Sequence, residues 1–185
     1  MSNIYDNLKK GDILLTHHSR NLVGGLIERW TGGEWTHAMI YAGEWHGHHM
    51  ILESHYGGVK YTTLETYLKQ GYKLAVLRSG LDATFIDKVI SAAEEEIGLG
   101  YDYKGLVGYL WADVVWSITG KRKQYDDAED RFCSELVKHH FEHTGKLDLT
   151  GKPSANTSPM DLYRSLLLMH IGEYEHGIRI YSQNN

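Results

Sequence analysis

The sequence contains one cysteine among its 185 residues. A lone cysteine cannot form a disulfide within the chain, so the fold does not depend on an oxidising compartment. An excess of basic residues is also missing, because the formal net charge is -5 and the isoelectric point is about 6.2. This charge leaves no broad basic face for a phosphate backbone, so we do not expect nucleic acid as a partner.

Long uninterrupted apolar segments are absent as well. The longest apolar stretch, residues 106–118, is interrupted by Gly108 and Asp113 and is too short to span a bilayer. The N-terminus carries Asp6 and Lys10 where a secretory signal requires an apolar stretch. We therefore expect a cytoplasmic protein without an integral membrane segment, and export by another route stays open.

Helical and strand patterns alternate along the chain without a repeat or a low-complexity linker. With 42% hydrophobic and 23% charged residues, a chain of this length can bury one core. We therefore expect a single domain over residues 1–185, of the α+β class, with an antiparallel sheet packed against helices. Strands are predicted over residues 11–16, 37–42, 50–54, 73–78 and 178–181, and helices over residues 22–30, 64–70, 83–97, 106–118, 133–145 and from residue 159.

Several helix starts carry capping signals. Residues 62–65, Thr-Thr-Leu-Glu, have capping-box spacing, Asp82 is the expected N-cap of the next helix, and Ser158 and Pro159 suit a cap and first position. The three glutamates at residues 94–96 are predicted to form a solvated face. The inward residues of the helix that follows Asp82 are predicted to be Phe85, Val89, Ala92, Ala93 and Ile97.

A β-hairpin is predicted around the polar turn of residues 44–49. Residues 37–42 alternate between two faces, with His37 on the same face as Met39 and Tyr41, and β-favouring residue types predominate. If the second strand, residues 50–54, pairs about this turn, Glu53 lies near His37.

Cys133 stands at the predicted first turn of a helix. Unpaired backbone N–H groups and the positive end of the helix dipole favour a thiolate there. A lone thiol with a distant histidine such as His37 suggests a nucleophile and its base, which folding brings together. The alternative is that Cys133 packs as a small hydrophobic residue and that one of the 12 histidines is near it by chance.

The order of five segments resembles the circularly permuted papain-like hydrolases of the NlpC superfamily, in the YiiX/YaeF-like branch, over roughly residues 11–165. The resemblance implies Cys133 as nucleophile, His37 as general base and acid, and Glu53 as the carboxylate that orients the imidazole. In papain itself the cysteine comes first, whereas here it comes last, as expected for the permuted branch. The segments are Gly-Asp-Ile at 11–13, Thr-His-Ala-Met-Ile-Tyr at 36–41, Leu-Glu-Ser at 52–54, Gly-Tyr-Asp at 100–102 and Phe-Cys-Ser-Glu-Leu at 132–136.

These residues suffice for acyl chemistry. The thiolate of Cys133 would attack a carbonyl carbon, and the backbone N–H groups of Cys133 and Ser134 would form part of an oxyanion hole. His37 would protonate the leaving group and then activate water. Glu53 would fix the imidazole tautomer, although it could also be a surface glutamate at a strand end. Trp35 is the candidate for a substrate-binding cleft wall, with burial in the core as the alternative.

Other histidines offer a weaker hypothesis of a metal site. His46, His48 and His49 share a turn, and His139 and His143 lie four residues apart on a predicted helix. Neither set has a recognised ligand pattern with a nearby cysteine or carboxylate. We therefore expect neither a metal nor another cofactor.

The predicted function is a cysteine-dependent hydrolase of an amide bond. The resemblance suggests a peptidase or amidase that acts on a small peptide, such as a cell-wall peptide, or on an N-acyl amide. One alternative is an acyltransferase like the lecithin retinol acyltransferase group, which needs a dry acceptor cleft; polar residues at 17–20, near the expected entrance, favour water instead. The other alternative is a non-catalytic binding protein with an unreactive Cys133.

Overall fold

The structure is a computed structural model that describes residues 2–17, 34–55, 58–98 and 133–180. Within these ranges the strands form one antiparallel sheet in the order β4-β3-β2-β1-β5-β6-β7. Helices pack on this sheet, which confirms the predicted α+β class with an antiparallel sheet. The strands are β1 (Ile13–His17), β2 (His37–Trp45), β3 (His48–His55), β4 (Gly58–Thr63), β5 (Lys73–Arg78), β6 (Met169–Glu175) and β7 (Ile178–Ile180).

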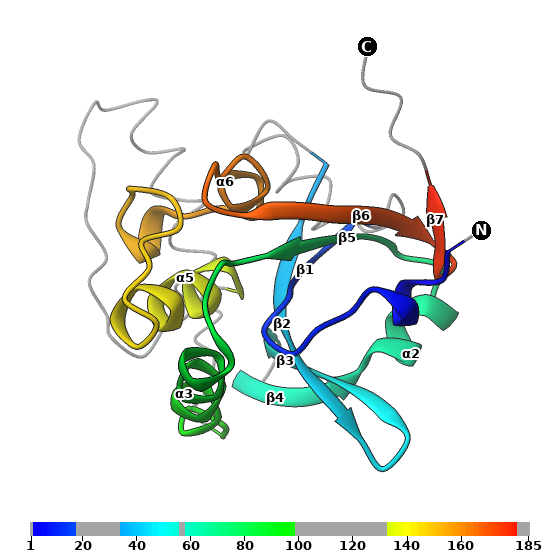
Figure 1. Ribbon diagram of the computed structural model, residues 1–185, viewed down its shortest axis with the longest axis horizontal. Coiled ribbons are helices and arrows are strands. Elements are labelled where there is room, and N and C mark those ends of the chain that lie inside the picture. The colour runs from blue at the N-terminus through cyan, green and yellow to red at the C-terminus, as the bar shows by residue number, and fades with distance from the viewer. Residues whose placement is uncertain (1, 18–33, 56–57, 99–132, 181–185) are drawn as a thin grey trace, which may run out of the picture.

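The described helices cover both faces of the sheet. Figure 1 shows α3 and α5 side by side on one side of the sheet and α2 beside the N-terminal segment on the other. None of the described helices has the length and apolar composition needed to cross a membrane. The helices predicted over residues 22–30 and 106–118 lie outside the described residues. The helices are η1 (Ile4–Asp6), α2 (Leu64–Lys69), α3 (Ala83–Glu94), α5 (Cys133–His143), η2 (Ser154–Asn156) and α6 (Pro159–Tyr163).

Strands predicted from apolar or alternating segments are confirmed as β1, β2, β3, β5 and β7. We did not predict β4 and β6. In β4 the first two residues alone are buried, and in β6 Tyr174 is the one buried residue. Strands that bury so little need no alternation of apolar and polar residues, so periodicity does not reveal them.

The predicted hairpin is formed by β2 and β3. Ile40 lies opposite Leu52, and an irregularity between Tyr41 and Gly43 shifts the register by one residue near the turn. Continuing the register from Ile40 puts Glu53 diagonally across from His37 on the same face of the sheet, a separation that long side chains bridge. The hairpin therefore holds His37 and Glu53 near each other on one face of the sheet.

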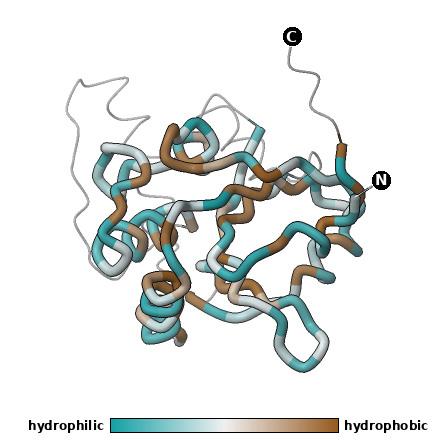
Figure 2. Tube along the Cα trace, viewed as in Figure 1, coloured by the Kyte–Doolittle hydropathy of each residue, from teal (hydrophilic) through white to brown (hydrophobic). Residues whose placement is uncertain are grey.

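Apolar side chains are buried on both faces of the central strands. Ile13 and Leu15 of β1 face α3 and α5, whereas Leu14 faces α2 and the N-terminal segment. Figure 2 shows hydrophobic residues along the strands between these layers. The sheet thus separates two cores, and residues at the start of β2 lie where both layers can reach them.

Two of the three predicted capping signals mark helix starts, those of α3 and α6. Asp82 accepts a hydrogen bond from the N–H of Phe85 at the start of α3, and Ser158 and Asp161 form a capping box at α6 with Pro159 in its first turn. The capping box predicted at residues 62–65 is wrong, because β4 continues to Thr63, which makes no side-chain cap.

The buried face of α3 is rotated from the predicted one. Val89 and Ala93 are buried as predicted, but Ile86 and Ile90 replace the predicted Phe85 and Ala92. Phe85 is 36% exposed and Ile97 is 44% exposed. The helix offers apolar residues on more than one side, and its position over the sheet selects which side is buried.

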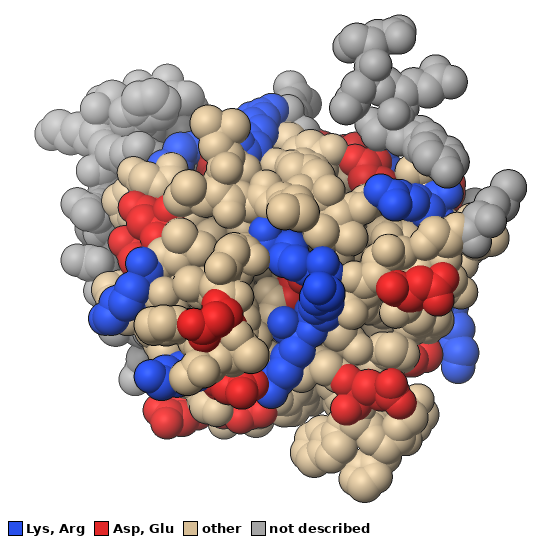
Figure 3. All heavy atoms as spheres, viewed as in Figure 1, with Lys and Arg blue, Asp and Glu red and all other residues tan. Residues whose placement is uncertain are grey.

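Charges of both signs occur on the surface. Figure 3 shows a short central band of basic side chains, with acidic side chains on either side of it, on the face drawn. This mixed pattern agrees with the formal net charge of -5.

Candidate active site

His37 and Glu53 are in direct contact. Nε2 of His37 lies 2.8 Å from Oε2 of Glu53, and the two side chains are 15% and 2% exposed. A buried carboxylate beside an imidazole fixes the ring orientation and favours its charged form. Glu53 is therefore buried, and the alternative of a surface glutamate at a strand end is wrong.

Glu53 has further partners. The Tyr67 hydroxyl, from α2, donates a hydrogen bond to the same Oε2 that contacts His37. Nζ of Lys60 lies 3.9 Å from the other oxygen, Oε1. Burial, followed by the Glu53 charge, raises the pKa of the Tyr67 phenol, so Tyr67 stays a neutral donor. A buried carboxylate needs such partners to remain ionised.

Sequence reasoning missed Tyr67. It is one of 13 tyrosines, and the segment that carries it was notable for its capping pattern alone. No periodicity connects a short helix with a carboxylate on a strand 14 residues earlier. Packing of α2 against the sheet creates this contact.

Cys133 is the first residue of α5 and is half-buried. Its thiol forms a hydrogen bond with the His37 side chain, and the backbone N–H groups of Ala38 and Ser134 donate to the sulfur. Because Nε2 of His37 is engaged by Glu53, Nδ1 is the ring nitrogen left for the thiol. The structure therefore brings Cys133, His37 and Glu53 together.

The thiol and the imidazole shift each other's pKa. Burial alone would raise the pKa of Cys133, but the charge and hydrogen bond of His37, then the N–H groups of Ala38 and Ser134, lower it below its ordinary value. Burial alone would lower the pKa of His37, but Cys133 and then Glu53 raise it to about 10. A thiolate–imidazolium pair is thereby favoured near neutral pH.

The first turn of α5 is anchored from outside the helix. The buried Ser134 hydroxyl donates a hydrogen bond of 2.5 Å to the carbonyl oxygen of Thr157. The backbone N–H group of Ser134, in contrast, donates a hydrogen bond to the Cys133 sulfur. Ser134 can therefore serve the site through its N–H group and not through its hydroxyl.

Trp35 does not line the site. Its side chain is fully buried in the core beside α3 and α5, with the Tyr163 ring at 5.4 Å and Nζ of Lys73 at 5.0 Å from its ring. Complete burial argues against the predicted substrate contact and agrees with the alternative, a tryptophan packed in the core. Proximity in sequence to His37 did not determine the direction of the side chain, because Trp35 precedes β2 and the alternation of that strand does not extend to it.

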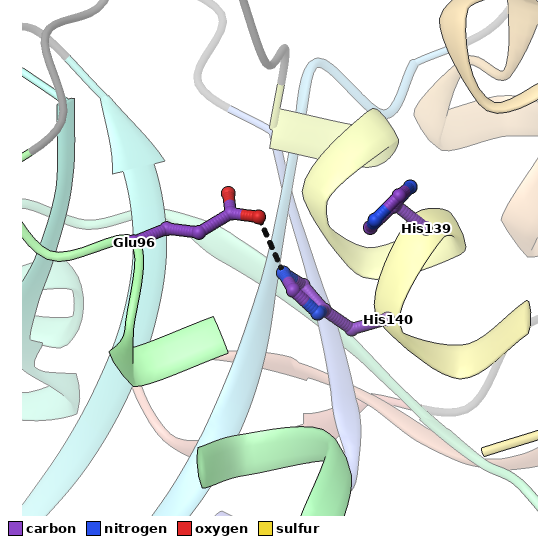
Figure 4. A group of neighbouring side chains, drawn as sticks. All are labelled: Glu96, His139 and His140. Atoms are coloured by element: carbon purple, nitrogen blue, oxygen red, sulfur yellow. Dashed lines mark ion pairs between the residues drawn. The ribbon is translucent and has the colours of Figure 1, made fainter. Parts of the chain in front are cut away.

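The histidines considered as metal ligands lie elsewhere. His49 contacts the Tyr41 hydroxyl through Nδ1 at 2.7 Å, and the rings of His139 and His143 are 4.4 Å apart. A group that we did not predict consists of Glu96, His139 and His140, whose potential ligand atoms all lie within 4.8 Å of one another (Figure 4). Nothing in the sequence indicated this cluster, because Glu96 was predicted to belong to a solvent-exposed face formed by the three glutamates at residues 94–96.

Comparisons with known proteins identify a family and a structure of similar fold. A family model described as "Permuted papain-like amidase enzyme, YaeF/YiiX, C92 family" matches residues 7–157. The crystal structure of metalloprotein yiiX from Escherichia coli O157:H7 superimposes with a TM-score of 0.66 at 18% identity, covering 91% of this chain and 98% of that chain. No curated protein matches the sequence.

Proposed function

We propose a function from the premise that this chain belongs to the C92 family of permuted papain-like amidases, the YaeF/YiiX family. The family assignment establishes the class of hydrolase, and the roles of individual residues are our inference. We infer that the protein cleaves an amide bond through a thioester on Cys133, with His37 and Glu53 completing a triad.

The contact series from Cys133 through His37 to Glu53 is the observation that carries this proposal. A thiol at a helix start needs a base in contact with it, and the base needs an orienting group. All three come from separate elements, α5, β2 and β3. Their convergence supports a catalytic role over that of a packed, inert cysteine.

The reaction then proceeds in two halves. The Cys133 thiolate attacks the amide carbon, and the tetrahedral intermediate collapses when His37 gives its proton to the departing nitrogen, which leaves as an amine. A water molecule next attacks the thioester while His37 accepts its proton. The second collapse breaks the carbon–sulfur bond, releases a carboxylic acid and restores the thiolate and imidazolium.

Backbone N–H groups near the thiol have a role both in the resting enzyme and in the tetrahedral intermediate. In the resting enzyme the N–H groups of Ser134 and Ala38 stabilise the thiolate. When sulfur bonds to carbon it loses its negative charge, so these donors are no longer required there. We assign the N–H groups of Cys133 and Ser134 to the oxyanion that forms at the same moment.

Tyr67 is assigned as a positioning residue. It donates to the Glu53 oxygen that contacts His37, and its ring stacks near the imidazole with centroids 6.4 Å apart and planes 17° apart. It does not touch the reacting atoms. By holding the carboxylate, it holds the imidazole at the thiol.

The proposed substrate is a small peptide or an N-acyl amide. The steps above use protein groups alone, and none passes through a metal, although the neighbour yiiX is described as a metalloprotein. Water is the expected acceptor of the acyl group. Transfer to another acceptor and binding without catalysis are the competing outcomes.

The test measures amine release from a panel of peptides and N-acyl amides, without added metal. Wild-type protein should hydrolyse a member of the panel, Cys133→Ala should lose activity, and His46→Ala, in the distant hairpin turn, should retain it. Because the thiol contributes little packing, Cys133→Ala should unfold near the wild-type temperature. Near-normal turnover by Cys133→Ala, or acyl transfer from phospholipid that exceeds hydrolysis, would overturn the proposal. Inactivity combined with an unreactive Cys133 would favour a binding protein.

A further inference from the structure

A second cluster of ligand-type side chains lies away from the thiol. Glu96 follows α3, and His139 and His140 belong to α5 (Figure 4). His140 is seven residues after Cys133, which corresponds to about 10 Å along a helix. This cluster is therefore separate from the proposed active site, and an inference about it does not rest on the proposed function.

The contact between His140 and Glu96 has an unusual form. Nε2 of His140 lies 3.2 Å from Oε1 of Glu96. Within the described part of the chain, however, neither ring nitrogen of His140 has a hydrogen-bond partner. The carboxylate is thus close to the nitrogen without the alignment that a shared proton requires.

This separation suits two ligands of one cation. Nitrogen and oxygen ligands bind zinc at about 2.0–2.2 Å in tetrahedral geometry, so two ligand atoms lie about 3.4 Å apart. The observed 3.2 Å is close to that value. His139, whose side chain is half-buried, supplies a third potential ligand atom within 4.8 Å of the other two.

Burial gives the second, independent reason. His140 is 4% exposed, and a polar side chain so deeply buried is normally hydrogen-bonded. The free energy lost by leaving both ring nitrogens without hydrogen bonds is recovered if one of them binds a cation. Two imidazoles and a carboxylate form a ligand set that zinc accepts, with the fourth position left to water.

We propose that Glu96, His139 and His140 bind one divalent cation of the zinc type. The ion would connect the segment after α3 to the middle of α5, the helix whose first residue is Cys133. It would stabilise the folded chain, because a ligand that binds the native state alone raises the unfolding temperature. It would take no direct part in chemistry at the thiol.

The experiment uses full-length protein without an affinity tag and with the substitution Cys133→Ala, so that the thiol cannot bind metal. Zn²⁺ affinity is measured in competition with a chelator, and Co²⁺ absorption reports the coordination geometry. We expect one ion per chain, a visible spectrum of tetrahedral Co²⁺ and a higher unfolding temperature with Zn²⁺. Glu96→Gln and His139→Ala should each weaken affinity at least about tenfold, since even the loss of outer-shell partners costs that much.

His143→Ala is the matched control, because His143 is exposed on the same helix and its ring contacts His139. It should retain the affinity of the Cys133→Ala parent. Absence of saturable binding would overturn the proposal, as would a loss in His143→Ala equal to that in Glu96→Gln. Glu96→Gln preserves side-chain size, and its unfolding temperature without metal shows whether the fold is intact.

Discussion

A buried carboxylate, Glu53, organises the candidate site at the scale of single residues. Its side chain is 2% exposed, and one of its oxygens contacts both the imidazole of His37 and the hydroxyl of Tyr67. An ionised group at this depth is stable when its charge is paired and hydrogen-bonded. These contacts hold the imidazole toward Cys133.

The coupled pKa values predict the pH range in which the protein is active. The pKa of Cys133 is lowered, so its thiolate forms at lower pH than in a free cysteine. The pKa of His37 is raised to about 10, so the imidazolium persists until pH exceeds that value. Amide hydrolysis should therefore rise as the thiol ionises and fall near pH 10, which a pH–rate profile measures.

Iodoacetamide alkylation tests the thiol separately. Its rate should reach half-maximum below the ordinary cysteine pKa of about 8.5, and His37→Ala should move that midpoint upward. Alkylation of wild-type protein only above this pH would indicate an inert cysteine. The control is His49→Ala, which removes a histidine that is hydrogen-bonded to Tyr41; it should leave the midpoint of alkylation unchanged.

Tyr67→Phe should lower kcat/KM about tenfold, because a hydrogen bond to a charged group contributes about 1.5–3 kcal/mol and part of that loss reaches the imidazole. Without the phenol, Glu53 exerts its full charge on His37, so the alkaline limb of the pH profile should move to higher pH. A purely structural tyrosine would leave that limb in place. Kinetics across pH provide the measurement.

Tyr61→Phe is a suitable control for this variant. Tyr61 also donates its hydroxyl to a glutamate, Glu94, but at an exposed position. Removal of that hydrogen bond should leave both kcat/KM and the alkaline limb unchanged. Equal effects of the two substitutions would contradict a positioning role for Tyr67.

At the scale of elements, α5 combines the nucleophile with its own anchors. Ser134 ties its first turn to the Thr157 carbonyl. Further along, the fully buried Nζ of Lys138 contacts Glu142 at 2.5 Å and Asp148 at 2.7 Å. The first interaction ties the start of the helix to the segment before α6, and the second ties its middle to the loop that follows it.

Asp148 provides a test of the second anchor. The hydrogen bond from Lys138, then those from the N–H groups of Gly151 and Thr150, lower the pKa of Asp148 to about 2. A carboxylate with a lowered pKa stabilises the fold above its unfolded value and loses that contribution as pH falls through the folded one. The unfolding temperature of Asp148→Asn should thus lie below wild type above pH 4, and the difference should shrink toward pH 2.

Thermal unfolding across this pH range checks the prediction. Asp87→Asn removes an exposed carboxylate paired with Lys10, and should change the unfolding temperature little at any pH because exposed ion pairs contribute little. A difference between wild type and Asp148→Asn that stays constant from pH 5 to pH 2 would show that Lys138 does not depend on the Asp148 charge.

At the scale of the whole molecule, the candidate site lies where two layers meet. Helix α5 brings Cys133 from one face of the sheet, while Tyr67 belongs to the helix on the opposite face. His37, the first residue of β2, contacts Cys133 and also Glu53, the carboxylate to which Tyr67 donates. The sheet therefore separates the two layers, and His37 lies at one end of a central strand, where groups from both layers meet.

The family match and the neighbouring crystal structure describe the same architecture over most of the chain. The histidine and acid precede the cysteine in sequence, yet the three side chains converge. Chain order is thus independent of site geometry, as expected for permuted relatives. That one domain extends over all of residues 1–185 stays a prediction.

The sequence by itself determined those features that depend on local patterns. Alternation of residues predicted the hairpin and the proximity of Glu53 to His37. It did not predict the irregularity between Tyr41 and Gly43, which shifts the register by one residue and puts the two side chains on one face. A single thiol at a helix start indicated Cys133, and cap residues such as Asp82 and Ser158 marked where helices begin. Each of these signals lies within a few residues, where periodicity and capping act.

Only the tertiary structure decided which distant groups meet. In the folded chain Trp35 is buried in the core, and the Tyr67 hydroxyl donates to Glu53. The N–H group of Ala38 donates to the thiol, and Glu96, one of three consecutive glutamates, lies beside His140. These contacts depend on how helices settle on the two faces of the sheet, and a helix with apolar residues on several sides does not specify that position. Packing against the sheet selects one face, and the polar contacts follow from that choice.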